Sequence, residues 1–257
     1  MIISHPEKDQ HLLIDKKVLK EEIKVANLSK KDKVIEIGAG TGILTAELVE
    51  NAGKVLAFEL DKQFKEELEK IKKTNKNLEI VYGNALEFSW KRYDKIVSNI
   101  PYTLSEPIIL KAIKEEIPFL VLIVSESFKD VLIDKETKIG FMASLFYDIN
   151  PLLFVNKSCF SPPPKVNSWL IKMEKKDSLD KILRVLRSFV LKKGKIKNAL
   201  VFSLVKQGKT KNQAREILEK MKIPEKILEK PVEKITGKFL QNLRSSLLNI
   251  SALLQAP

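Results

Sequence analysis

Short apolar runs alternate with amphipathic stretches over the first half of this 257-residue chain. The runs cover residues 34–37, 55–58, 78–81, 95–97 and 119–124. They are too short for ordinary helices and are typical of strands buried on both faces. The stretches between them carry apolar residues at helical spacing, over residues 43–50, 62–72 and 105–115. This alternation predicts repeated βαβ units, and therefore an α/β domain with a mostly parallel sheet.

The pattern changes twice toward the C-terminus. Residues 151–155 and 167–173 are expected to form two more strands around a Pro-rich loop, closing the sheet with a hairpin-like, antiparallel end. From about residue 177 only helical patterns remain. We therefore expect a Rossmann-like domain over residues 1–176 and a small all-helical domain over residues 177–257.

Three of the nine glycines, Gly38, Gly40 and Gly42, follow the first expected strand. Glycines gather where the backbone takes positive φ or lies close to a ligand. Their spacing is GxGxG, whereas a dinucleotide pyrophosphate site has GxGxxG. The difference favours S-adenosylmethionine, which has no phosphate. A purely structural turn is the alternative.

Polar residues follow the next two strands. Glu59 ends the second strand, where a carboxylate can accept hydrogen bonds from both hydroxyls of a ribose. Asn84 follows the third strand and can accept from the amino group of an adenine. Each position has a simpler interpretation, as a surface acid and as an ordinary turn residue.

Asn99, Ile100, Pro101 and Tyr102 follow the fourth strand, at the sheet edge where open α/β proteins bind ligands. The Asn99 side-chain carbonyl can accept one hydrogen of an amino group. Pro101 favours an extended Ile100, whose backbone carbonyl can accept the second hydrogen. Two acceptors would make the nitrogen nucleophilic, and Tyr102 offers a flat face for a planar base. Methylation of an amino nitrogen is indicated; a strand followed by a proline turn is the simpler reading.

Positive charge is concentrated in the last third of the chain. Residues 1–171 contain 25 Lys+Arg and 25 Asp+Glu, whereas residues 172–257 contain 21 and 8. The whole net charge of +13 therefore lies in residues 172–257, most of which belong to the expected helical domain. Lysine-rich segments at residues 192–197 and 206–211 are expected to contact phosphates of a polyanion. Solvated helix faces in a lysine-rich chain would produce the same excess.

Composition excludes several other classes of protein. One cysteine, Cys159, excludes a disulfide framework within the chain, and with two histidines it gives no zinc-type spacing, so no metal is expected. The longest apolar run, residues 117–124, is far too short to span a membrane, and the N-terminus lacks a signal-peptide pattern. We expect a cytoplasmic protein.

The motifs together resemble the ribosomal RNA adenine dimethyltransferase family, the KsgA type, to which the Erm methyltransferases are related. Two further segments carry the resemblance, which covers essentially the whole chain. Residues 10–13 resemble the family's GQxFL cofactor motif, and residues 160–168 match its FxPxPxVxS loop. The fold that this implies is a Rossmann-like S-adenosylmethionine-dependent methyltransferase.

The resemblance assigns roles to individual residues. It implies S-adenosylmethionine binding by the following residues: Gln10, His11, Leu13, Gly38, Gly40, Glu59, Asn84 and Asn99. Asn99, Ile100 and Pro101 would hold the target amine, and Tyr102 and Phe160 would enclose the target adenine. Asp9, Leu12 and Asn84 depart from the family pattern, and residues 125–145 match it poorly. Asn84 keeps one acceptor but loses a charge, so weaker cofactor binding with activity retained is expected. Residues 125–145 would either alter how the substrate is seated or form a diverged helix.

The implied reaction is transfer of methyl groups to N6 of two adjacent adenosines. By family analogy these lie in the 3′-terminal hairpin loop of small-subunit ribosomal RNA, within an immature subunit, and the enzyme is expected to be a monomer. Two other functions stay open. One is an amino-methyltransferase acting on DNA adenine or protein glutamine. The other is a non-catalytic assembly or transcription factor on the same fold.

Overall fold

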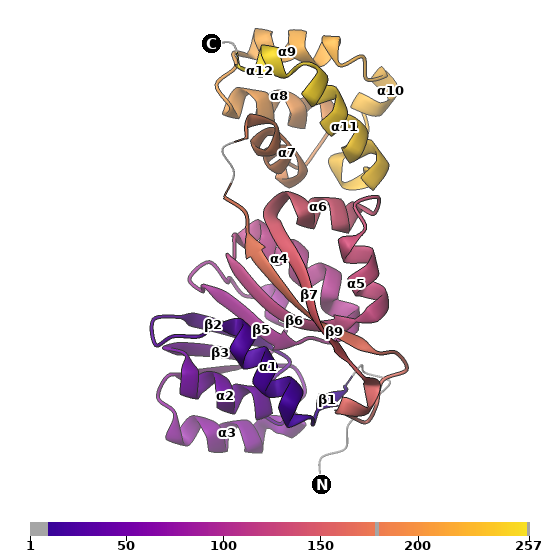
Figure 1. Cartoon of the computed structure of the whole chain (residues 1–257). Helices are drawn as coiled ribbons and strands as arrows, with labels where there is room; N and C mark the ends of the chain where they lie inside the picture. The colour runs from indigo at the N-terminus through magenta and orange to yellow at the C-terminus, as the bar shows by residue number, and fades with distance from the viewer. Residues whose placement is uncertain (1–9, 178–179, 256–257) are drawn as a thin grey trace. The chain divides into compact units, whose positions relative to one another are not determined.

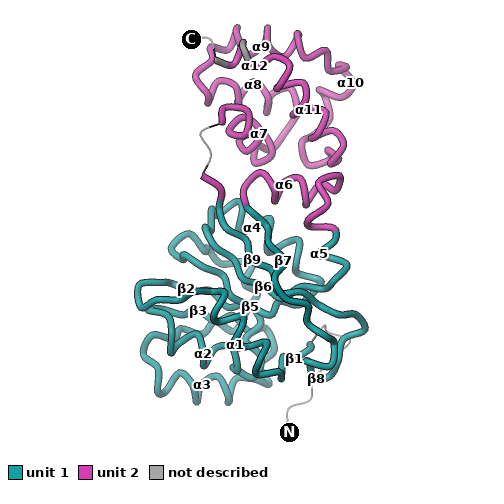
Figure 2. The backbone as a smooth tube through the Cα atoms, in the orientation of Figure 1, with its two compact units in different colours: residues 1–130, 148–175 teal, residues 131–147, 176–257 magenta. Residues whose placement is uncertain are grey.

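The computed structural model describes residues 10–177 and 180–255 (Figure 1). The chain divides into two compact units (Figure 2). The first contains residues 1–130 and 148–175, and the second contains residues 131–147 and 176–257. The border between residues 175 and 176 is one residue from the expected border between residues 176 and 177. Residues 131–147, which the expected division left in the first domain, belong instead to the second unit.

Seven strands form the main sheet, in the order β4-β3-β2-β5-β6-β9-β7. They are β2 (Lys33–Ile37), β3 (Lys54–Glu59), β4 (Leu78–Tyr82), β5 (Lys95–Asn99), β6 (Phe119–Ser125), β7 (Tyr147–Val155) and β9 (Ser168–Lys175). The first five pair in parallel, and β9 pairs antiparallel with β6. The expectation of a mostly parallel sheet with an antiparallel end is confirmed.

Helices cover both faces of this sheet (Figure 1). Those of the first unit are α1 (Lys16–Ala26), α2 (Ile43–Asn51), α3 (Lys65–Thr74) and α4 (Ser105–Glu115), and α5 (Glu126–Ile133) leads into the second unit. Apolar residues of α1, α2 and α3 pack in one cluster with residues of the sheet, among them Val34, Val55 and Val97. In the view of Figure 1, α4 lies behind the strands.

Helix α1 was not predicted from the apolar pattern, although its start signal is present in the sequence. The Asp15 side chain accepts hydrogen bonds from the backbone N–H groups of Lys17 and Val18, which is the usual N-cap arrangement. The helix ends at Asn27, which takes a left-handed conformation (φ 43°).

The order of the strands reverses between β2 and β5. From β2 the chain continues to β3 on one side, and β5 lies on the other side. Ligands of open α/β sheets bind at such a switch point, outside the carboxyl ends of the strands. A two-stranded sheet of β1 (Leu12–Leu13) and β8 (Phe160–Ser161) belongs to the same unit and joins two distant parts of the chain.

The second unit is helical. It contains α6 (Lys138–Phe146), α7 (Lys181–Leu191), α8 (Ile196–Lys206), α9 (Lys211–Lys220), α10 (Glu225–Leu228), α11 (Gly237–Asn249) and α12 (Ser251–Gln255). Helix α6 packs against α7 and α11. Helix α6 carries apolar residues on all of its faces, so it is stable only where other parts of the protein bury each of those faces. Arg187 of α7 also donates to the carbonyl of Leu145 at 2.7 Å and to that of Lys176 at 2.9 Å.

Candidate active site

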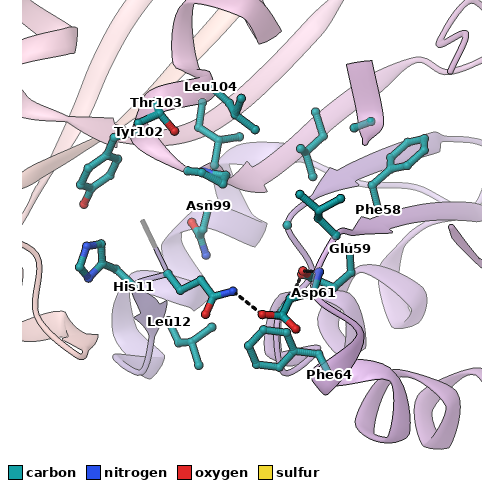
Figure 3. A pocket seen from close by; sticks show the side chains of 18 of the residues that line it. His11, Leu12, Phe58, Glu59, Asp61, Phe64, Asn99, Tyr102, Thr103 and Leu104 are labelled. Atoms are coloured by element: carbon teal, nitrogen blue, oxygen red, sulfur yellow. Dashed lines mark hydrogen bonds between the residues drawn. The ribbon is translucent and has the colours of Figure 1, made fainter. Parts of the chain in front are cut away.

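A cavity of about 510 Å³ lies at the carboxyl ends of β2, β3, β4 and β5 (Figure 3). This volume is typical of a site for a small organic ligand. Of the residues predicted for the site, the following line the cavity: Gln10, His11, Gly38, Gly40, Glu59, Asn84, Asn99, Ile100, Pro101, Tyr102 and Phe160. The structure thus brings together residues from six separate motifs.

Leu13 is placed differently from the prediction. It is buried in the core and is not among the residues that line the cavity, whereas its neighbour Leu12 is. The two residues form β1, where side chains alternate between faces, so only one of them can face the ligand. Asp9, the other departure noted at this motif, lies outside the described residues.

The glycine loop allows the backbone to approach both neighbouring motifs. Gly38 has φ +80° and Gly40 has φ +53°, conformations that other residues rarely adopt. A Cβ on Gly40 would lie 2.8 Å from a side-chain carbon of Leu12, and one on Gly38 would lie 3.5 Å from the Pro101 ring. Side chains here would fill the space beside the cavity.

Glu59 is the last residue of β3 and is 6% exposed. Its carboxylate accepts the Gly40 N–H at 2.7 Å and the Asp61 N–H at 2.8 Å. Burial raises the pKa of Glu59, and these backbone donors oppose the rise. Each carboxylate oxygen has a second lone pair, so the group retains acceptor capacity for ligand hydroxyls.

Asp61 and Phe64 line the same part of the cavity and were not predicted. Asp61 accepts a hydrogen bond from Gln10 Nε2 at 2.9 Å, which ties the segment before β1 to the loop after β3. Figure 3 shows Asp61 and Glu59 on one side of Asn99, and His11 and Tyr102 on the other. Asp61 follows Glu59 by two residues, which is the only signal that could have identified it.

Asn84 caps a turn and also lines the cavity. Its Oδ1 accepts the Leu86 N–H at 3.0 Å and its Nδ2 donates to Glu87 at 3.2 Å, which caps the short 3₁₀ turn of Ala85–Glu87. The residue also lines the cavity. Its contact with a cofactor adenine stays a prediction.

Asn99 ends β5 and stands in the centre of the cavity (Figure 3). Ile100 is 3% exposed, so its side chain is a core group and its main chain is the part available to a ligand. Pro101 has φ −54°, and a 3₁₀ turn, Tyr102–Leu104, follows it directly. A strand followed by a proline turn, the simpler reading of this segment, is therefore present, and Asn99 also lines the cavity.

Tyr102 is oriented by two contacts from distant segments. Its hydroxyl lies 2.6 Å from Oγ of Ser168, a fully buried residue at the end of the FxPxPxVxS loop. Its ring stacks on His11, with centroids 6.1 Å apart and an interplanar angle of 26°. His11 Nδ1 in turn lies 3.0 Å from the Pro162 carbonyl oxygen. His11, predicted as a cofactor residue, therefore lies on the aromatic side of the cavity.

The lining fits S-adenosylmethionine. Apolar residues such as Phe58 and Phe64 provide surface for an adenine, Glu59 provides a hydroxyl acceptor, and the glycine loop leaves room along the backbone. Among the described residues there is no group of three or more His, Cys, Asp or Glu that could hold a metal ion. In the same part of the chain, no helix is long and apolar enough to cross a membrane. The class that this fold and cavity define is the S-adenosylmethionine-dependent methyltransferases.

Comparison with known proteins identifies the family. The model of the ribosomal RNA adenine dimethylase family matches residues 4–235, so the chain belongs to this family. A probable ribosomal RNA small subunit methyltransferase A from Methanopyrus kandleri is 33% identical over 240 residues, which are 87% of this chain and 85% of that protein. The chain is therefore an S-adenosylmethionine-dependent ribosomal RNA adenine dimethyltransferase.

Solved structures agree with this assignment. A dimethyladenosine transferase from Plasmodium falciparum aligns with a TM-score of 0.65 and 25% identity, covering 95% of this chain and 98% of that chain. The 23S rRNA methyltransferase ErmE aligns with a TM-score of 0.63 and 18% identity, covering 92% and 99% of the two chains, and shows the fold alone.

Proposed function

We propose that this enzyme methylates N6 of two adjacent adenosines in the 3′-terminal hairpin loop of small-subunit ribosomal RNA. The substrate would be an immature ribosomal subunit, and the enzyme would act in the cytoplasm as a monomer during subunit biogenesis. The observation that carries the proposal is the position of Asn99, in one cavity with Glu59, Tyr102 and Phe160.

Asn99 and Ile100 would hold the amino group of the target base. The carbonyl oxygen of the Asn99 side chain and the backbone carbonyl of Ile100 each accept one N–H. Both bonds draw the nitrogen lone pair out of conjugation with the ring and increase its nucleophilicity. S-adenosylmethionine supplies, when bound, a methyl group on a positively charged sulfur.

Tyr102 and Phe160 would hold the ring of the target base. An enzyme that modifies a base must remove it from its stack, and stacking on aromatic side chains offsets part of that free energy. The Ser168 contact holds the Tyr102 hydroxyl, so the face of the ring is set before substrate arrives. His11, which stacks on Tyr102 in this structure, would give way to the base.

Catalysis would depend mainly on positioning. The amine loses its proton after the methyl has been transferred, so no general base is required to start the reaction. Holding two reacting groups in near-attack geometry can lower a barrier by roughly 7 to 11 kcal/mol. The residues of the cavity would supply this alignment.

The helical unit would dock the RNA through phosphate contacts. Lys193, Lys206 and Lys211 are exposed there. Lys209, which the sequence grouped with them, is only 6% exposed and is poorly placed to contact phosphate. Lys195 and Lys197 are paired with acids, Lys195 with Glu229 at 2.5 Å and Lys197 with Glu225 at 3.3 Å.

The test is incubation of small ribosomal subunits that lack the modification with labelled S-adenosylmethionine, followed by mapping of the labelled nucleotides. We expect label on two adjacent adenosines and none on subunits already modified. Asn99→Ala should abolish transfer while only weakening cofactor binding. Asn51→Ala, on α2 and bonded to the Glu47 carbonyl of its own helix, is the matched control and should be active.

Other outcomes would favour the other functions. Transfer to DNA adenine or to a glutamine amide, with none to the subunit, would identify a different amino-methyltransferase. The absence of both transfer and cofactor binding in calorimetry would indicate a binding protein. Transfer by Asn99→Ala at the normal rate would show that Asn99 does not hold the amine.

A further inference from the structure

Glu22 is a fully buried acid with no role in the reaction described above. It lies on the core-facing side of α1, with Val18, Leu19 and Ala26, and has 0% exposure. A carboxyl group in such a position is strongly destabilising unless hydrogen bonds satisfy it. Its partners therefore indicate why this position carries an acid.

The partner of Glu22 is the Asn99 carboxamide. Both Glu22 carboxylate oxygens lie 3.2 Å from the same terminal atom of that side chain. The oxygen and nitrogen of an amide have nearly the same shape, so their positions follow from the hydrogen bonds that they make. Against an ionised Glu22, only Nδ2 can occupy this place, donating to Oε1 and Oε2.

This contact determines which end of Asn99 is available to the substrate. Glu22 does not line the cavity, whereas Asn99 does. With Nδ2 held by Glu22, Oδ1 is the end left for a ligand. We propose that Glu22 is a positioning residue for methyl transfer, which holds Nδ2 of Asn99 and thereby presents Oδ1 to the amino group of the base. The inference rests on the proposed role of Asn99 as amine acceptor.

The charge on Glu22 decides the orientation. A protonated Glu22 can donate its O–H to Oδ1, which would turn Nδ2 toward the substrate, so that a donor would face the N–H groups of the amine. Burial and the neighbouring Glu36 of β2 raise the pKa of Glu22 well above its usual value, although the bond from Asn99 opposes the rise, so the orientation with Oδ1 toward the substrate becomes populated as the pH increases. Glu36 is itself buried, bonded to Thr45 Oγ1 at 2.6 Å, and has a pKa raised to about 8 by burial and by Glu59.

The first test uses Glu22→Leu and Glu22→Gln under single-turnover conditions. Glu22→Leu should slow methyl transfer by about 10- to 100-fold, the effect of losing a hydrogen bond to a charged group. Cofactor Kd and RNA KM should change less than twofold. Glu21→Gln, at the partly exposed neighbouring position, is the matched control and should transfer at the normal rate.

The pH dependence of the transfer rate of Glu22→Gln shows whether Glu22 orients Asn99 or only fills space in the core. The wild-type rate should rise with pH as Glu22 ionises. The variant should lose this rise, because a glutamine satisfies either orientation of Asn99 at every pH. A Glu22→Leu enzyme that transfers at the normal rate, or a Glu22→Gln enzyme that keeps the wild-type rise, would overturn the proposal.

A double variant keeps the test decisive if Glu22→Leu fails to fold. Asn99→Asp alone places two carboxylates in contact and should be inactive. Adding Glu22→Gln restores one donor and one acceptor, and should recover transfer at least tenfold over Asn99→Asp. No recovery, with cofactor binding intact, contradicts the role of Glu22. Full activity of Asn99→Ala would contradict the role of Asn99 as amine acceptor, on which this inference rests, whereas no transfer by the wild-type enzyme to unmodified subunits would contradict the proposed function itself.

Discussion

The Ser98 hydroxyl bridges both backbone groups of Ile37. Ser98 Oγ accepts the Ile37 N–H at 3.1 Å and donates to the Ile37 carbonyl at 2.6 Å. The paired residues of β2 and β5 end at Ile35 and Ile96, so the serine takes over where the strands separate. It thus stabilises the opening at which Gly38 and Asn99 reach the cavity.

Ser98→Ala should destabilise the enzyme by about 1 to 3 kcal/mol. Ser98 is fully buried, and its loss leaves two backbone groups without this partner. Urea unfolding followed by circular dichroism measures the effect. Ser203→Ala is the control, because this equally buried serine bonds only to the Ala199 carbonyl of its own helix in the contacts described, and it should lose less. An equal decrease in the free energy of unfolding of Ser98→Ala and Ser203→Ala would show that the bridge stabilises the protein no more than an ordinary buried serine does.

Glu59→Gln should weaken S-adenosylmethionine binding by about 10- to 100-fold. The substitution removes a charged acceptor and places an NH₂ group against a backbone donor, either Gly40 N–H or Asp61 N–H. Isothermal titration gives the Kd. Glu79→Gln, which disrupts an exposed ion pair with Lys54, should bind normally. If Glu59→Gln bound S-adenosylmethionine with unchanged affinity, Glu59 would not be a cofactor-binding residue.

Tyr102→Ala should lower kcat/KM by roughly 5- to 150-fold, since base stacking on an aromatic side chain contributes about 1 to 3 kcal/mol. Tyr102→Phe keeps the ring and removes only the hydroxyl contact with Ser168, so its decrease in kcat/KM should be smaller than that of Tyr102→Ala. Single-turnover transfer to unmodified subunits separates the two variants. Equal losses would mean that the hydroxyl, and not the ring, is the important group.

Glu36 should make the stability of the enzyme decline with rising pH. Its pKa is raised to about 8 by burial, against an ordinary value of 4.5. A group with a raised folded-state pKa contributes fully below about pH 4.5, and this contribution is lost as the pH rises through about 8. The stability of Glu36→Gln relative to the wild type should therefore increase between about pH 5 and 8 in thermal unfolding. A constant difference across this range would contradict the prediction.

Replacing Lys193, Lys206 and Lys211 by glutamine should reduce the salt dependence of RNA binding. Each phosphate contact contributes roughly 0.7 to 0.9 to the slope of log K against log salt concentration. Filter binding between 50 and 300 mM KCl measures this slope. The exposed Lys72 and Lys73 of α3 provide a matched control in the first unit. An unchanged slope in the triple variant would show that these lysines do not contact RNA.

Much of the cavity could be predicted because it is built from the ends of strands. Gly38, Glu59, Asn84 and Asn99 each follow an apolar run, and the carboxyl ends of parallel strands meet at one edge of the sheet. The order of the motifs along the chain therefore placed them together without knowledge of their distances. Leu13 was the exception, because a two-residue strand gives too short a pattern to show which side chain faces inward.

The amino-acid sequence by itself determined the α/β class, the glycine loop, the Asn99–Tyr102 turn and the basic C-terminal helices, since each depends on local pattern or strand order. Only the tertiary structure decided that residues 131–147 join the helical unit, that Lys209 is buried, that His11 stacks on Tyr102 and that Glu22 holds Asn99. These relationships join residues far apart in the chain or depend on which face of a helix turns inward. These relationships result from the packing of side chains in three dimensions, which a short sequence pattern cannot predict.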